Sequence, residues 1–213
     1  MSSRKADYRV IEWQEVMNGV GISCALDIAI HPSNSKIIML TIPGVDGSVD
    51  GFDNKYLHIA ETVQEKYGVA VVRISNPFIS SYHWESNIRQ AIDYIQMNAQ
   101  EICGNETFEL RIMAHSAGAA VIGRIAHEYA EITRVLLINP ALKLKPNDIH
   151  DGLAKLSGRQ VTVLVGSKDS SSDDIAEVVD NHTDLYVVDG ADHHFSGDNF
   201  QLFLDSPNKY LFS

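Results

Sequence analysis

The chain has 213 residues, 45% of them apolar and 21% charged, so it can bury a substantial core and has the composition of an ordinary globular protein. A net charge of −11 argues against binding to nucleic acids, anionic membranes or polyanionic substrates, all of which prefer a basic surface. No segment approaches the roughly 18 consecutive apolar residues of a membrane span.

The two cysteines point to a reducing compartment. Cys24 and Cys103 lie in or beside apolar segments and show no metal-ligand spacing, so we expect reduced thiols in the core. The first ten residues carry basic side chains but no following apolar run, which does not fit a secretory signal. These features predict a cytoplasmic protein. We also expect no metal and no cofactor.

The N-terminal part of the chain favours strands. Residues 8–16 and 22–30 alternate between apolar and polar side chains around the turn NGVG, which predicts an antiparallel hairpin. Residues 36–43, KIIMLTIP, form a near-continuous apolar run, typical of a strand buried on both faces of a parallel sheet. Residues 54–68 then show helical spacing that ends at Gly68, a plausible C-cap.

Strands and helices alternate along the rest of the chain. We predict strands at 69–75, 108–114, 133–139, 160–166 and 183–190, and helices at 86–102, 117–130, 147–158, 171–182 and 199–212, the last interrupted near Pro207. This order predicts an α/β fold with a mostly parallel sheet of about eight strands, an N-terminal antiparallel hairpin and helices on both faces. With no linker or repeat, residues 1–213 are expected to form one domain. Ligands of such sheets bind at the carboxyl ends of the strands.

Ser116 follows one of these strands in the stretch AHSAG and precedes a helix. A serine on a sharp strand-to-helix turn exposes its hydroxyl, as a nucleophile requires, and the positions flanking it must be small. Gly118 fits this requirement, and Ala114 adds one methyl group where glycine is usual. The alternative is that Ser116 is an ordinary helix N-cap, a position that serine favours.

Two further strand ends carry polar side chains. The strand at 161–166 is followed by SKDSSSDD, in which Asp169, Asp173 or Asp174 could act as an acid or form a turn. The last strand is followed by DGADHHFSGD, which contains His193 and His194. A loop histidine is often structural, but the sequence offers no third spaced ligand that would make this pair a metal site.

A glycine-rich loop, GVDGSVDG, follows the strand that ends near Pro43 and fits no phosphate-binding motif. The order Ser116, Asp169, His193, each after a predicted strand, together with such a loop, supplies what nucleophilic acyl transfer needs. The histidine would take the serine proton, the aspartate would orient the imidazole, and backbone N–H groups would stabilise the oxyanion.

With these residues the chain resembles the α/β-hydrolases over nearly its whole length. AHSAG is similar to the elbow of small Bacillus-type lipases, and GADHHF resembles the segment around the catalytic histidine of dienelactone-hydrolase-like members. That match implies His193 rather than His194, and VLVGSKD implies Asp169 rather than Asp173 or Asp174. PGVDGS resembles the family's oxyanion loop, with Pro43 where histidine is common, and implies the backbone N–H groups of Val45 and Ala117 as oxyanion donors.

Only about twenty residues separate Asn139 from the next strand, too few for a cap domain beyond one short helix. We therefore expect an open site whose apolar substrate pocket includes Phe78, Tyr82, Trp84 and Leu142, although these side chains could equally be ordinary loop packing. The resemblance implies a small serine hydrolase acting on ester or thioester substrates. A catalytically silent binding fold and an acyltransferase that uses the same serine stay open as alternatives, and the oligomeric state is not predicted.

Overall fold

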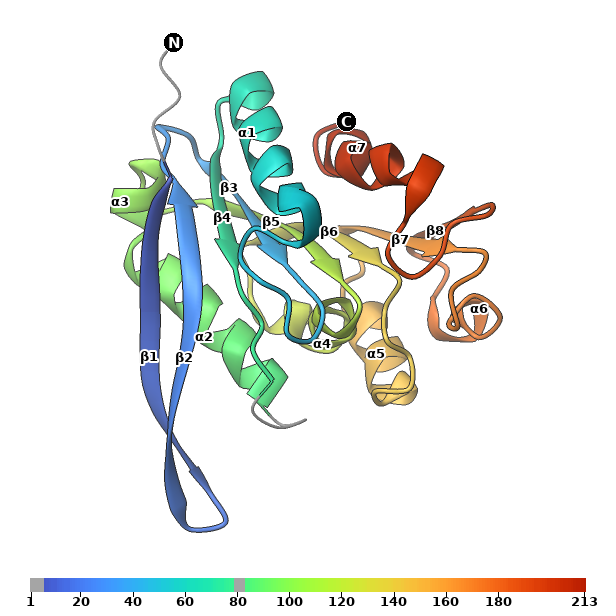
Figure 1. The fold of residues 1–213 in the computed structure, drawn as a ribbon, viewed down its shortest axis with the longest axis horizontal. Helices are drawn as coiled ribbons and strands as arrows, with labels where there is room; N and C mark the ends of the chain where they lie inside the picture. The colour runs from blue at the N-terminus through green and yellow to red at the C-terminus, as the bar shows by residue number, and fades with distance from the viewer. Residues whose placement is uncertain (1–5, 79–82) are drawn as a thin grey trace.

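A computed structural model describes residues 6–78 and 83–213 (Figure 1). Its centre is one eight-stranded sheet with the strand order β1-β2-β4-β3-β5-β6-β7-β8. The strands are β1 Asp7–Met17, β2 Val20–His31, β3 Ile37–Ile42, β4 Ala70–Ile74, β5 Glu109–His115, β6 Ile132–Ile138, β7 Gln160–Gly166 and β8 Thr183–Val188. β1 and β2 are antiparallel, β2 pairs antiparallel with β4, and every later pairing is parallel, which confirms the predicted sheet.

The N-terminal hairpin turns at Asn18 and Gly19, which both have positive φ values, 51° and 80°. A two-residue turn of this kind matches the right-handed twist of the strands, and Asn-Gly is its preferred sequence. The hairpin is long, and its turn end extends beyond the rest of the sheet (Figure 1). The turn projects past the carboxyl ends of the parallel strands, because Ile28 of β2 already pairs with Ile74 at the end of β4 and the hairpin continues beyond that point.

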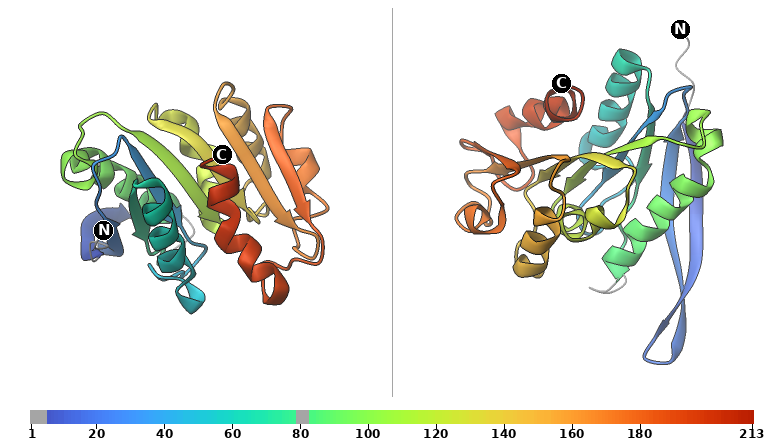
Figure 2. Two further views of the ribbon diagram at one scale, coloured as in Figure 1. Left: turned by 90° about the horizontal axis from the view of Figure 1, so that it is seen from above. Right: turned by 180° about the vertical axis from the view of Figure 1, so that it is seen from behind.

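Helices cover both faces of the sheet (Figure 2). The α-helices are α1 Lys55–Tyr67, α2 His83–Met97, α3 Ala99–Cys103, α4 Ala117–Ile125, α5 Pro146–Ala154, α6 Ile175–Val178 and α7 Phe200–Tyr210, with short 3-10 helices at Phe52–Asn54, Ala126–Glu128 and Gly197–Asn199. α1 packs with α7 on one face, whereas α4 packs with α2 and α5 on the other. Each layer buries its own apolar cluster against the sheet.

Three helix predictions differ from the structure by more than the positions of the helix ends. The helix expected over 86–102 is divided at Asn98 into α2 and α3. The helix expected over 171–182 is much shorter and consists of α6 alone. Before α6 the chain forms turns, in which the Asp169 carboxylate accepts a hydrogen bond from the Ser171 N–H, and after α6 the backbone of Val179 is extended. The interruption expected near Pro207 is absent. Pro207 has no N–H to donate to the Phe203 carbonyl, and the Ser206 hydroxyl donates to this carbonyl instead.

Between β6 and β7 the structure has α5 as its one helix, as expected for a chain without a cap domain. Gly68 ends α1 with a φ of 66°, the left-handed C-cap that the sequence predicted. Within the described part of the chain, no helix combines the length and the hydropathy needed to cross a bilayer.

Candidate active site

Ser116 occupies the sharp turn between β5 and α4. Its φ of 56° and ψ of −119° lie outside the regions that ordinary residues adopt, and its N–H donates to the Ile138 carbonyl at the end of the neighbouring strand β6. Although Ser116 is the N-cap residue of α4, its side chain makes no capping hydrogen bond. The hydroxyl is therefore used elsewhere, which argues against the simple N-cap explanation.

The small residues beside Ser116 let the helix and the strands approach closely. A Cβ atom added at Gly118 would lie 2.6 Å from the Pro43 carbonyl oxygen and 2.6 Å from Cγ2 of Ile42, too close for any larger side chain. At the other flank Ala114 is fully buried within β5, so the structure accommodates its methyl group. The turn at Ser116 therefore requires glycine at position 118 but accepts alanine at position 114.

The three side chains that the sequence singled out meet at the carboxyl ends of β5, β7 and β8. The Ser116 hydroxyl oxygen lies 2.9 Å from Nε2 of His193. Nδ1 of the same imidazole lies 2.5 Å from Oδ2 of Asp169. A carboxylate only accepts, so Nδ1 carries the proton and Nε2 is free to accept from Ser116. This chain of two hydrogen bonds is the arrangement of a Ser-His-Asp triad.

Asp169 is held in place by more than its histidine. Its side chain is only 2% exposed, and its second oxygen, Oδ1, accepts hydrogen bonds from the N–H and the hydroxyl of Ser171. Burial alone would raise the pKa of this carboxyl, but the hydrogen bonds from Ser171 and His193 outweigh burial and lower the pKa below its usual value. Asp169 is thus kept ionised facing the imidazole.

The neighbouring candidates are placed differently. His194 lies beside His193, with ring centroids 5.1 Å apart and the planes nearly perpendicular, and burial lowers its pKa. Asp174 lines the adjacent cleft, whereas Asp169 holds the histidine. Among the described residues no group of three or more His, Cys, Asp and Glu side chains could hold a metal ion.

The glycine-rich loop after β3 lies against the serine. A Cβ atom at Gly44 would be 2.9 Å from Cβ of Ser116 and 3.3 Å from its hydroxyl oxygen, so only glycine allows this approach. The loop is fixed because the N–H of Asp46 donates to the carbonyl of Asn76 and the N–H of Gly47 donates to that of Gly44. In the described residues neither Val45 nor Ala117 has a protein acceptor for its backbone N–H, so both donors are free for a ligand oxygen.

Sequence reasoning missed two residues that position His193. The Asn139 side chain donates to the carbonyl oxygens of Asp192, at 3.1 Å, and His193, at 2.9 Å, and it accepts from the Gly166 N–H at 2.8 Å. It therefore joins the end of β7 to the loop that carries the histidine. The position directly after β6 and the φ of 44°, which asparagine tolerates, are the signals that could have identified Asn139.

His115, the residue before the serine, is the second. Its Nε2–H donates to the His193 carbonyl at 2.8 Å, and its ring lies 5.0 Å from that of His193. Burial lowers the pKa of His115 to about 3, with the Lys55 charge adding to the effect. His115 is thus a neutral donor with a fixed tautomer at physiological pH.

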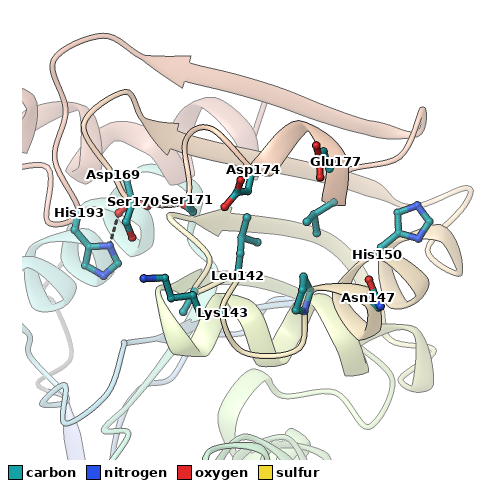
Figure 3. A pocket seen from close by; sticks show the side chains of 13 residues that line it. Leu142, Lys143, Asn147, His150, Asp169, Ser170, Ser171, Asp174, Glu177 and His193 are labelled. Atoms are coloured by element: carbon teal, nitrogen blue, oxygen red, sulfur yellow. Dashed lines mark hydrogen bonds and ion pairs between the residues drawn. The ribbon is translucent and has the colours of Figure 1, made fainter.

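An open cleft of about 630 Å³ begins at His193 and Asp169 (Figure 3). The loop after β6, the start of α5 and the segment around α6 form its walls, and Leu142, Lys143 and Asn147 lie along it. Of the four predicted pocket residues, Leu142 therefore lies in the cleft beside His193. His150 and Glu177 lie at the end of the cleft farther from the triad.

The other predicted pocket residues are placed elsewhere or are not described. Trp84 is 9% exposed and belongs to the main core cluster, and its ring lies 5.4 Å from that of Phe78. Phe78 is half exposed, and its N–H donates to Asp46 in the glycine-rich loop. Neither ring is among the described residues that line the cleft. Tyr82 lies outside the described residues.

No family model and no curated protein matches this sequence. Solved structures do. Dienelactone hydrolase from Anabaena variabilis is 15% identical with a TM-score of 0.69, covering 96% of this chain and 97% of its own. Est1E from Butyrivibrio proteoclasticus with bound ferulic acid is 15% identical with a TM-score of 0.68, covering 94% of this chain and 98% of its own. The Pyrococcus furiosus esterase Pf2001 is 13% identical with a TM-score of 0.66, covering 96% of this chain and 93% of its own. The chain has the α/β-hydrolase fold, which confirms the predicted fold class.

Proposed function

We propose that the protein is a serine hydrolase that cleaves carboxylic esters or thioesters of small substrates through an acyl-enzyme on Ser116. The observation that carries this proposal is the continuous hydrogen-bond chain from Ser116 through His193 to Asp169. Ser116 lies on a strained turn beside free backbone N–H donors, and His193 and Asp169 line an open cleft. Structural similarity to proteins described as esterases and as a dienelactone hydrolase supports the same reaction class.

In the first half of the reaction, the Ser116 hydroxyl gives its proton to Nε2 of His193 while its oxygen attacks the substrate carbonyl carbon. Asp169 stabilises the imidazolium that forms. The carbonyl oxygen becomes negatively charged and accepts from the N–H groups of Val45 and Ala117, each contributing a factor of roughly 10²–10³ in rate. His193 then protonates the leaving alkoxide or thiolate, and an ester of Ser116 remains.

In the second half, water enters from the open cleft and His193 takes its proton. The hydroxide attacks the acyl carbon, the oxyanion forms against the same two N–H groups, and the serine leaves with the proton from the imidazolium. Because the described residues form no cap domain above the cleft, we propose small substrates that enter from solvent. Both halves of the reaction use only protein groups and water, so we propose that the reaction requires no metal or cofactor. The two free, buried cysteines fit a cytoplasmic protein.

Turnover of short-chain 4-nitrophenyl esters and acyl thioesters by wild type and Ser116→Ala tests the proposal. We expect Ser116→Ala to reduce kcat by at least about 10⁴-fold with an unchanged circular dichroism spectrum. Ser23→Ala, which removes an exposed hydroxyl from β2, is the matched control and should retain full activity. Turnover by Ser116→Ala at the wild-type rate would overturn the proposal. Adding methanol separates hydrolysis from acyl transfer, since an acyltransferase would form mostly methyl ester.

A further inference from the structure

Lys55 is a buried cation on the opposite face of the sheet from α4. It is the first residue of α1, and only 6% of it is exposed. Its Nζ lies 4.1 Å from the centroid of the Phe203 ring and 5.2 Å from that of Tyr56. These contacts with aromatic faces replace part of the lost hydration of the ammonium group.

Among the residues that the structure describes, the charge of Lys55 lacks an acidic partner. Within the described part of the chain, no carboxylate lies within ion-pair distance of Nζ and no acceptor receives a hydrogen bond from it. Burial lowers the pKa of Lys55 to about 8, and no nearby acid counteracts this effect. The side chain is still mostly protonated at neutral pH. A buried charge without a counterion is costly, so the site is electrostatically incomplete as it stands.

Lys55 lines a cavity of about 520 Å³ between the starts of α1 and α7. The cavity is lined by Phe52, Asp53, Lys55, His194, Ser196, Gly197 and Phe200. The lining thus combines two aromatic residues, Phe52 and Phe200, with the cationic residue Lys55. The two helices, of 13 and 11 residues, also direct the positive ends of their dipoles toward this region.

We propose that this cavity is a binding site for a carboxylate carried on an apolar carbon skeleton. The Lys55 ammonium supplies the countercharge, and Phe52 and Phe200 contact the skeleton. Asp53 is exposed at the edge of the cavity and disfavours a second negative charge on the ligand, so a monoanionic acid fits better than a phosphate dianion. The site shares no lining residue with the cleft beside the triad, although His194 directly follows His193.

Calorimetric titration with benzoate, benzamide and inorganic phosphate tests this site. We expect wild type to bind benzoate at least about tenfold more tightly than benzamide, because the two differ mainly in charge. Phosphate should bind more weakly than benzoate. Equal affinity for benzoate and benzamide, tighter binding of phosphate, or no binding of benzoate would each overturn the proposal.

The variant Lys55→Met keeps most of the side-chain stem and removes the charge, so we expect benzoate affinity to fall at least about tenfold. Lys66→Met is the matched control. Lys66 lies on the same helix and above the Tyr67 ring, but it is exposed, so its replacement should leave benzoate binding unchanged. An unchanged affinity in Lys55→Met would overturn the proposal. If Lys55→Met does not fold, Lys55→Arg replaces it and should retain benzoate binding. The relative affinity of wild type for benzoate and benzamide then decides whether the site recognises a carboxylate.

Ser116→Ala should bind benzoate as wild type does, because the site does not use the triad. Failure of ester turnover and failure of carboxylate binding are therefore separate results.

Discussion

The Nε2–H of His115 donates to the backbone carbonyl of His193 at 2.8 Å, so the residue before the candidate nucleophile fixes the main chain of the candidate base. The Asn139 side chain donates to the same oxygen at 2.9 Å. Two buried donors thus converge on one carbonyl. The imidazole of His193 is oriented through its own backbone as well as by Asp169.

Replacing His115 by glutamine should weaken the pH dependence of stability. The folded-state pKa of His115 is about 3, below the unfolded value of about 6.5, so the unfolded chain binds more protons between these values and stability falls as the pH falls. From pH 7 to pH 5 this one group should cost about 2 kcal/mol of unfolding free energy. Glutamine does not titrate but can still donate to His193.

Urea denaturation at pH 7 and pH 5 measures this difference. His115→Gln should lose about 2 kcal/mol less than wild type between the two pH values. His150→Gln, at an exposed histidine, is the control and should behave as wild type. His31 has a pKa lowered to about 4 by burial and contributes to the slope of every variant alike. An equal loss in His115→Gln and wild type would contradict this account.

Asp169→Asn should reduce kcat by up to about 10⁴-fold, because an asparagine amide can favour the imidazole tautomer that cannot accept the serine proton. Asp174→Asn is the matched control. Asp174 lines the same cleft and does not hold His193, so we expect less than about a tenfold change from its replacement. Steady-state kinetics with one ester measures both variants. A larger loss of kcat in Asp174→Asn than in Asp169→Asn would show that Asp169 is not the acid that orients His193.

The two adjacent histidines should differ sharply. His193→Ala removes the group that contacts both Ser116 and Asp169, and we expect a fall in kcat of about 10⁴-fold or more. His194→Ala removes a side chain from the wall of the other cavity and should change kcat by less than about tenfold. The ratio of the two kcat values is the measurement, and the reverse ranking would exclude His193 as the base.

Gly44→Ala should impair catalysis more than folding. The added methyl group would lie 2.9 Å from Cβ of Ser116, so the loop must move away and shift the Val45 N–H from the oxyanion position. We expect roughly a 10²-fold loss of kcat, as for one lost oxyanion donor. Gly21→Ala is the control, since a Cβ atom there meets nothing within 4 Å. Wild-type kcat in Gly44→Ala would show that this loop does not contribute the donor.

Much of the fold could be predicted because the strands carry continuous or alternating apolar patterns. The strand ends at Ser116, Asp169 and His193 followed from the same reasoning, since parallel strands bring their carboxyl ends to one edge of the sheet. Leu142 could be expected near the cleft because it lies in the loop after β6. Trp84, the second residue of α2, belongs instead to the core, since an aromatic side chain packs equally well in a core or in a pocket wall.

What could not be predicted depends on contacts between distant segments. The roles of His115 and Asn139 arise from a carbonyl more than fifty positions away in the sequence, as the bonds to His193 show. The unbroken α7 depends on the Ser206 hydroxyl that compensates for Pro207. The short α6 follows from the turns that hold the Asp169 carboxylate, which helical spacing does not reveal.

The most direct test of the central claim is the intact mass of wild type and Ser116→Ala after exposure to a fluorophosphonate. An activated serine attacks phosphorus and displaces fluoride, so the account predicts one covalent adduct on wild type and none on Ser116→Ala. No adduct on wild type, or an equal adduct on both proteins, would contradict an activated Ser116.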